Sequence, residues 1–133
     1  LINEKKIKEH SKKILSDFSV NTDNVELKSQ FLSGGNLQKL IIGRELITSP
    51  ELLICFNPTW GLDVGAINYI HETLIKINEQ KKSIILISTD TDELLKLSDK
   101  ICVINKGKLS KIMDAEEVTS EKLGILMGGG EIV

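Results

Sequence analysis

The chain has 133 residues, which is about the length of one domain and makes a multi-domain arrangement a poor expectation. Hydrophobic residues make up 41% and charged residues 27%, which is typical of a globular protein and excludes a disordered chain. With 17 basic and 19 acidic residues the formal net charge is -2, so there is no overall basic excess for nucleic acid or an anionic membrane. No apolar run approaches the roughly 18 residues of a membrane span.

Helices are predicted at two places in the first third of the chain. Residues 1–17 predict the first helix, with four apolar side chains roughly on one face: Ile7, Ile14, Leu15 and Phe18. Residues 36–47 predict the second helix, which ends at Ser49 and Pro50. The nearly continuous apolar run 51–56 that follows is typical of a strand buried on both faces.

Strands and helices alternate in the rest of the chain. Apolar residues at helical spacing predict a third helix, and these are Ile67, Ile70, Leu74 and Ile77. The run 83–88 predicts a second buried strand, and a short helix follows it. Segments 100–104 and 108–113 predict a hairpin with a turn at Asn105, Lys106 and Gly107. A last short helix is predicted at 120–127, and the alternation as a whole is typical of an α/β fold with a mainly parallel sheet.

The two cysteines, Cys55 and Cys102, both lie in apolar runs. We therefore expect both to be buried strand residues, because free cysteine is among the most buried residue types. Two lone cysteines make neither a disulfide framework nor a zinc motif. Neither histidine has a second His, Cys or acid at ligand spacing, so no metal site is expected.

One segment combines a serine and two glycines at the start of a predicted helix. Backbone N–H groups at a helix N-terminus point outward and favour an anion, and a serine hydroxyl adds a donor. The same turn also occurs as a plain helix start, so the pattern alone does not establish a ligand. The residues of this segment are Leu32, Ser33, Gly34, Gly35 and Asn36.

Further motifs follow residues 32–36 in order: an apolar strand, a short turn, a second apolar strand and a closing hairpin. This ordered set resembles the ABC ATPases, the nucleotide-binding domains of ABC transporters. The resemblance makes residues 32–36 the signature motif, which contacts ATP held by a partner cassette. It makes Gly61, Leu62 and Asp63 the D-loop, at the interface with that partner. Trp60, directly before the D-loop, is expected to be either an exposed interface aromatic or a half-buried plug of the loop.

The resemblance implies a partial P-loop NTPase (ABC ATPase) fold of the α/β class, with three layers, a mainly parallel sheet and a C-terminal β-hairpin. Residues 1–31 would be the end of the helical subdomain and its linker, and residues 32–133 the C-terminal part of the ATPase core. The phosphate-binding P-loop, G-x-x-x-x-G-K-[ST], does not occur in these residues. The chain is therefore expected to be the C-terminal part of a cassette.

Three positions depart from the family pattern where the catalytic residues belong. The strand of the Walker B motif ends in Phe56 and Asn57 in place of Asp and Glu, and Thr89 stands in place of the switch histidine. A phenyl ring cannot ligate Mg²⁺, and an amide is no general base. No catalytic residue is intact at this site, which is expected to be degenerate, whereas the signature motif would serve the site of the partner.

The resemblance implies the ATP-binding subunit of an importer for sugars or nucleosides, which couples ATP hydrolysis to solute uptake. The full-length parent would use ATP and Mg²⁺, and this fragment alone is expected to bind neither and to be inactive. The expected partners are the other cassette of the same polypeptide, membrane permease subunits and, indirectly, an extracytoplasmic solute-binding protein, but no nucleic acid. The expected location is the cytoplasmic face of the cell membrane. The residues leave a galactose- or ribose-type sugar and a nucleoside both open.

Two other functions are also open. One is the C-terminal lobe of a chromosome-maintenance or DNA-repair ATPase of the same superfamily. Such a lobe would keep the Asp-Glu pair and would follow a long coiled coil, whereas residues 1–18 show no sustained heptads. The other is a regulatory domain without ATPase activity.

Overall fold

The computed structural model describes residues 3–22 and 24–130 of the chain. These residues form two compact units. The first contains the described residues up to Leu53 together with Pro58–Ile84, and the second contains Ile54–Asn57 and the described residues from Ile85 onward. Each unit buries apolar side chains of its own, among them Ile70 in the first and Leu123 in the second.

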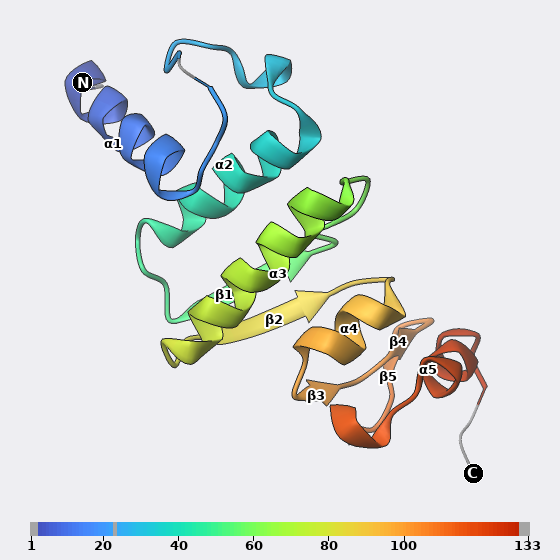
Figure 1. Ribbon diagram of the computed structural model, residues 1–133. Coiled ribbons are helices and arrows are strands. Elements are labelled where there is room, and N and C mark those ends of the chain that lie inside the picture. Colours follow the sequence, from blue (N-terminus) through green and yellow to red (C-terminus); the bar gives the residue numbers. More distant parts are fainter. Residues whose placement is uncertain (1–2, 23, 131–133) are drawn as a thin grey trace. The chain divides into compact units, whose positions relative to one another are not determined.

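Three helices form most of the first unit (Figure 1): α1 (Glu4–Asp17), α2 (Gly34–Leu46) and α3 (Val64–Glu79). A short 3-10 turn at Ser29–Phe31 precedes α2. Each helix begins at a side chain that accepts a hydrogen bond from the backbone N–H three residues on, and these caps are Asn3, Ser33 and Asp63. Such a cap stabilises a helix by about 1 kcal/mol, because it satisfies an amide that the first turn leaves free. The three predicted helices are confirmed.

Helix α1 packs on α2 at a glycine. A Cβ placed on Gly43 would lie 2.7 Å from both Ile14 Cγ2 and Phe18 Cδ2, so only a residue without a side chain lets the two helices approach this closely. Ile14 is buried there, whereas Ile7 is 52% exposed. The expected apolar face of α1 is therefore only partly buried, because α1 contacts α2 through its C-terminal turns.

Strands β1 (Leu52–Phe56) and β2 (Ser83–Ile87) pair with each other. The N–H of Ser83 donates to the Glu51 carbonyl at 2.9 Å, and the N–H of Asn57 donates to the Ile87 carbonyl at 2.7 Å. Both strands therefore run in the same direction, as expected for a parallel sheet.

The burial of β1 alternates along the strand. Leu53 and Cys55 are buried, but the residues of the opposite face are 48%, 61% and 72% exposed, and these are Leu52, Ile54 and Phe56. The expectation of a strand buried on both faces is thus wrong for the described residues. A continuous apolar run shows only that both faces tolerate burial, and whether a face is covered depends on segments elsewhere in the fold.

The second unit contains two short helices, α4 (Thr91–Leu97) and α5 (Ser120–Met127). Strand β3 (Lys100–Ile101) pairs antiparallel with β6 (Met113–Asp114), and a 3-10 turn at Ala115–Glu117 leads on from β6 towards α5. The core of this unit is a cluster of four buried aliphatic side chains: Ile101, Val103, Val118 and Leu123.

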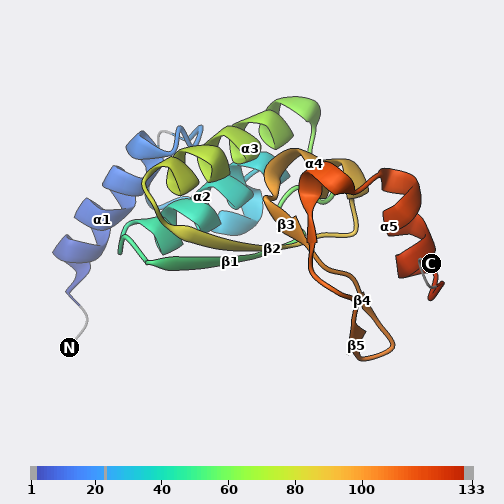
Figure 2. The same ribbon diagram turned by 90° about the horizontal axis from the view of Figure 1, so that it is seen from below.

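The closing hairpin is formed by β4 (Ile104–Asn105) and β5 (Lys108–Leu109), which pair antiparallel. Figure 2 shows the hairpin extending away from α4. Its turn consists of two residues, Lys106 and Gly107, with φ values of 45° and 78°. Two positive φ values suit the right-handed twist of a two-residue hairpin. The predicted hairpin is confirmed, and Asn105 belongs to its strand.

The two cysteines have different surroundings, although both are free thiols. Cys55 is buried as expected, and burial raises the pKa of its thiol to about 11, with a smaller contribution from Glu93. The expectation for Cys102 is wrong, because its side chain is exposed. Ile101 and Val103 on either side are buried, so the alternation of an extended segment turns Cys102 to solvent.

Candidate functional site

The signature segment (residues 32–36) forms the N-terminus of α2. Ser33 is the cap, with extended backbone, and its Oγ accepts a hydrogen bond from the Asn36 N–H at 3.4 Å. The next two residues, Gly34 and Gly35, lie in the first turn, where the amides have no carbonyl partner within the helix. Ser33 and Gly34 are exposed. A hydroxyl and first-turn amides at the start of a long helix are the donor set that binds an anion.

Asn36 connects the signature segment to the turn that follows α1. Its Oδ1 accepts the backbone N–H of Asn21 at 2.9 Å, and its Nδ2 donates to Ser33 Oγ at 3.1 Å. One turn further on, Lys39 Nζ donates to the Ser19 carbonyl at 3.3 Å and lies 4.3 Å from the centre of the Tyr69 ring. The bond between Asn36 and Asn21 and that between Lys39 and Ser19 had no signal in the sequence, because these residues are 15 and 20 positions apart.

The D-loop segment (Gly61, Leu62 and Asp63) lies against the signature segment. A Cβ on Gly34 would lie 3.4 Å from Leu62 Cδ2, and a Cβ on Gly35 would lie 2.9 Å from the Cβ of Ala66 in α3. The N-termini of α2 and α3 therefore meet, and the two motifs that the sequence separates are neighbours in the first unit.

Local geometry holds the D-loop segment in place. Gly61 has a φ of 73°, which glycine adopts without strain, and the Leu62 N–H donates to the Thr59 carbonyl at 3.2 Å. Asp63 Oδ1 accepts the Ala66 N–H at 2.9 Å and so caps α3. Trp60 is 86% exposed, which excludes the half-buried plug and leaves an exposed aromatic.

The three positions that the sequence predicts to be degenerate, Phe56, Asn57 and Thr89, lie in the second unit. Phe56 ends β1 and is 72% exposed. Asn57 has a φ of 44°, in the left-handed region that asparagine tolerates better than most residues. Its Oδ1 accepts the backbone N–H of Thr89 at 3.2 Å, so the structure brings Asn57 and Thr89 into contact. None of these three side chains is a carboxylate. The adjacent acid, Asp90, is engaged as the cap of α4, where its Oδ1 accepts the N–H groups of Asp92 and Glu93.

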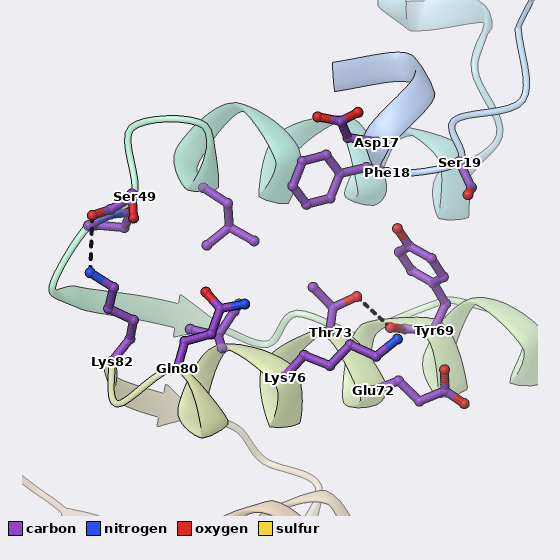
Figure 3. A pocket seen from close by; sticks show the side chains of 13 residues that line it. Asp17, Phe18, Ser19, Ser49, Tyr69, Glu72, Thr73, Lys76, Gln80 and Lys82 are labelled. Carbon is purple, nitrogen blue, oxygen red and sulfur yellow. Dashed lines mark hydrogen bonds between the residues drawn. The ribbon is translucent and has the colours of Figure 1, made fainter. Parts of the chain in front are cut away.

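A separate hollow of about 440 Å³ lies between the three helices of the first unit (Figure 3). Tyr69 points its hydroxyl towards the side that holds Asp17, Phe18 and Ser19. Carboxylates and ammonium groups both line the hollow, so its charge favours neither an anion nor a cation. None of the lining residues belongs to the signature segment. Sequence reasoning gave no signal for the hollow.

Among residues 3–22 and 24–130, no three His, Cys, Asp or Glu side chains gather as a metal ion would require. Within the same residues, each helix is too short or too polar to cross a membrane.

No family model matches the chain. Curated proteins do match it over most of its length. It is 45% identical over 96% of its residues to the nucleoside import ATP-binding protein NupA of Lactococcus lactis subsp. cremoris, and 40% identical over 90% to the guanosine import ATP-binding protein NupO of Bacillus subtilis. It is 36% identical over 92% to the galactose/methyl galactoside import ATP-binding protein MglA of Mannheimia succiniciproducens. The chain spans about a quarter of the length of these relatives, which is 25%, 23% and 24% in turn.

Solved structures share the fold. An inward-facing ABC transporter of the metal-chelate type superposes with a TM-score of 0.75 and 21% identity, over 90% of this chain and 48% of that one. A dimeric ATP-binding cassette bound to ADP and Pi gives a TM-score of 0.71 and 22% identity, over 86% of this chain and 50% of that one. At this identity the likeness concerns the fold.

The chain belongs to the ABC ATPases, and its fold is part of the P-loop NTPase fold of their cassettes. Within that family, its curated relatives are the ATP-binding proteins of sugar and nucleoside importers.

Proposed function

We propose that the chain is part of the ATP-binding subunit of an importer, and that it serves two nucleotide sites unequally. The observation that carries this proposal is the contrast between two positions in the chain. The signature segment presents an exposed hydroxyl and free first-turn amides beside the D-loop segment. At the end of β1, Asn57 and Thr89 bond to each other and offer no carboxylate.

In this proposal the signature segment completes the ATP site of a partner cassette. Ser33 and the amides of Gly34 and Gly35 face the terminal phosphate, where they stabilise the charge that develops during phosphoryl transfer. Leu62 lies beside Gly34. In this proposal Leu62, Asp63 and the exposed Trp60 contact the partner. The dimeric arrangement of the solved cassette with ADP and Pi supports such a pairing.

The site at Phe56, Asn57 and Thr89 does not fit a catalytic Mg²⁺. Magnesium requires oxygen ligands in near-octahedral geometry, and here the strand ends in a phenyl ring and an amide whose oxygen already accepts the Thr89 N–H. Without a carboxylate, no side chain at these positions takes a proton from an attacking water. We therefore assign hydrolysis to the partner site.

The larger assembly is proposed from the relatives. Residues 1–31 would end the helical subdomain, and residues 32–133 would form the C-terminal part of the ATPase core of one cassette. A second cassette in the same polypeptide and permease subunits would complete the importer at the cytoplasmic face of the membrane. A solute-binding protein outside that membrane would deliver the solute to the permease.

The solute is proposed to be a nucleoside, because the two nucleoside relatives are 45% and 40% identical whereas the galactoside relative is 36% identical. Deleting the full-length gene should abolish the uptake of labelled guanosine or uridine and leave galactose and ribose uptake unchanged. Restoring the gene should restore nucleoside uptake. Loss of sugar uptake with nucleoside uptake intact would assign the importer to sugars instead.

Asn57→Ala in the full-length protein should affect stability more than turnover. The change removes the bond to the Thr89 N–H and places alanine at a φ of 44°, at a cost of about 1–2 kcal/mol in unfolding free energy. Transport-coupled ATPase should stay within about twofold of wild type, a barrier change below ~0.5 kcal/mol. Asn57→Asp keeps the acceptor atom and is the matched control. A loss of turnover in a variant that is still folded would show that this half is catalytic.

A further inference from the structure

The side chain of Asn36 is half-buried and faces its own chain. It meets a backbone donor, the N–H of Asn21, and a hydroxyl, that of Ser33. A backbone N–H can only donate, so it must face the amide oxygen. The amide NH₂ group is then fixed in the direction of Ser33, where it must act as the donor. The orientation of Asn36 is therefore determined by the turn that follows α1.

This arrangement determines what the Ser33 hydroxyl can do. A serine hydroxyl has one hydrogen to donate and two lone pairs that accept. Asn36 uses both accepting positions, with its backbone N–H at 3.4 Å and its Nδ2 at 3.1 Å. The hydroxyl hydrogen is left for a partner outside the chain, and Ser33 is exposed.

We propose that Asn36 is a positioning residue for phosphoryl transfer: it holds the Ser33 hydroxyl as a donor towards the phosphate of the partner site and makes no contact with ATP itself. This inference rests on the proposed function of the signature segment. It adds a role for the turn after α1. By fixing Asn36 through the Asn21 amide, this turn decides that the Ser33 hydroxyl donates a hydrogen bond at the nucleotide.

Asn36→Asp is the informative change, because it keeps the shape and the acceptor for Asn21 but removes the donor to Ser33. The hydroxyl then donates to the new carboxylate and no longer to the phosphate. In the full-length protein with its permease, kcat for ATP should fall about tenfold, while KM for ATP stays within about twofold, because the partner's phosphate loop holds the nucleotide. Asn36→Ala removes the donor without redirecting the hydroxyl and should cost less, about threefold.

A double-mutant cycle with Ser33→Ala separates a positioning role of Asn36 from effects of its charge and from effects on folding. In the Ser33→Ala background no hydroxyl remains to be oriented, so Asn36→Asp and Asn36→Ala should lower kcat by less than about twofold further. Asn24→Ala is the matched control, because that side chain only closes a local turn by accepting the Glu26 N–H. It should leave kcat unchanged in both backgrounds.

Two other outcomes would contradict the positioning role of Asn36. If Asn36→Asp is as damaging in the Ser33→Ala background as in wild type, the residue acts through its charge or through the fold, and the positioning role is wrong while the proposed function stands. If Ser33→Ala itself leaves kcat unchanged, the signature segment does not serve a catalytic site, and the proposed function fails together with this inference.

Discussion

Replacing Gly34 by aspartate in the full-length protein is expected to lower ATPase activity by about 100-fold while the fold is retained. Gly34 is the first residue of α2, and a Cβ there meets only the flexible end of Leu62 at 3.4 Å. A carboxylate in the first helical turn interacts favourably with the helix dipole, so stability should not fall. The same carboxylate would occupy the place of the phosphate that we assign to the partner site, and like charges repel.

Gly34→Asn separates charge from size, because its side chain has nearly the same shape and no charge. Its ATPase should stay at least about tenfold above that of Gly34→Asp. Steady-state ATPase of the reconstituted importer gives the comparison, and thermal unfolding reports whether each variant is folded. Equal losses in the two variants would mean that bulk at this position causes the defect and that no anion approaches it. Gly35 is unsuitable for the same test, because a Cβ there would lie 2.9 Å from the Ala66 Cβ and would force α2 and α3 apart.

The largest expected loss of stability comes from Leu123→Ala in α5. Leu123 is fully buried and belongs to the cluster with Ile101, Val103 and Val118. Truncating a buried leucine removes its transfer free energy and leaves a cavity, at a cost of about 2–5 kcal/mol. Because β3 contributes Ile101 to this cluster and α5 contributes Leu123, we expect both segments to open more often.

Amide hydrogen exchange of the full-length protein measures this effect by segment. Leu123→Ala should speed exchange in peptides from residues 100–127 and leave those of α3 unchanged. Ile125→Ala on the same helix is the control, because Ile125 is 47% exposed and its truncation should cost less than about 1 kcal/mol. Similar exchange in both variants would show that the cluster does not hold α5 in place.

The sequence predicted the elements of this fold well where the signal is local. The start of α2 at Ser33 and of α3 at Asp63 could be anticipated, because a cap and its amide lie three residues apart. The hairpin turn at Lys106 and Gly107 was located to within one residue for the same reason. These features depend on neighbours along the chain and not on the rest of the fold.

Burial could not be predicted in the same way. The apolar runs around Ile54 and Cys102 both suggested core residues, yet Ile54 is 61% exposed and Cys102 lies at the surface. An apolar residue is buried only if another segment covers it, and periodicity carries no information about that segment.

The candidate site was predicted in part. The order of the motifs predicted that Ser33 and Gly34 belong to the signature motif and Asn57 to a degenerate site, and these roles stay predictions. The hydrogen bonds that the Asn21 N–H donates to Asn36 and the Thr89 N–H donates to Asn57 had no signal in the sequence, because they join residues that lie 15 and 32 positions apart. Tertiary contacts of this kind follow from the fold, so the sequence of one protein does not reveal them.

The left-handed backbone at Asn57 restricts which residues a mutation can place at the end of β1. Asparagine tolerates a φ of 44°, whereas glutamate there would cost about 1–2 kcal/mol and would also lose the bond to the Thr89 amide. A mutation to glutamate at this position therefore lowers stability before a metal ligand at position 56 can make the carboxylate useful. If the proposed function holds, a catalytic site here needs at least two changes whose benefits appear only together, so a single substitution at Phe56 or Asn57 should not create one.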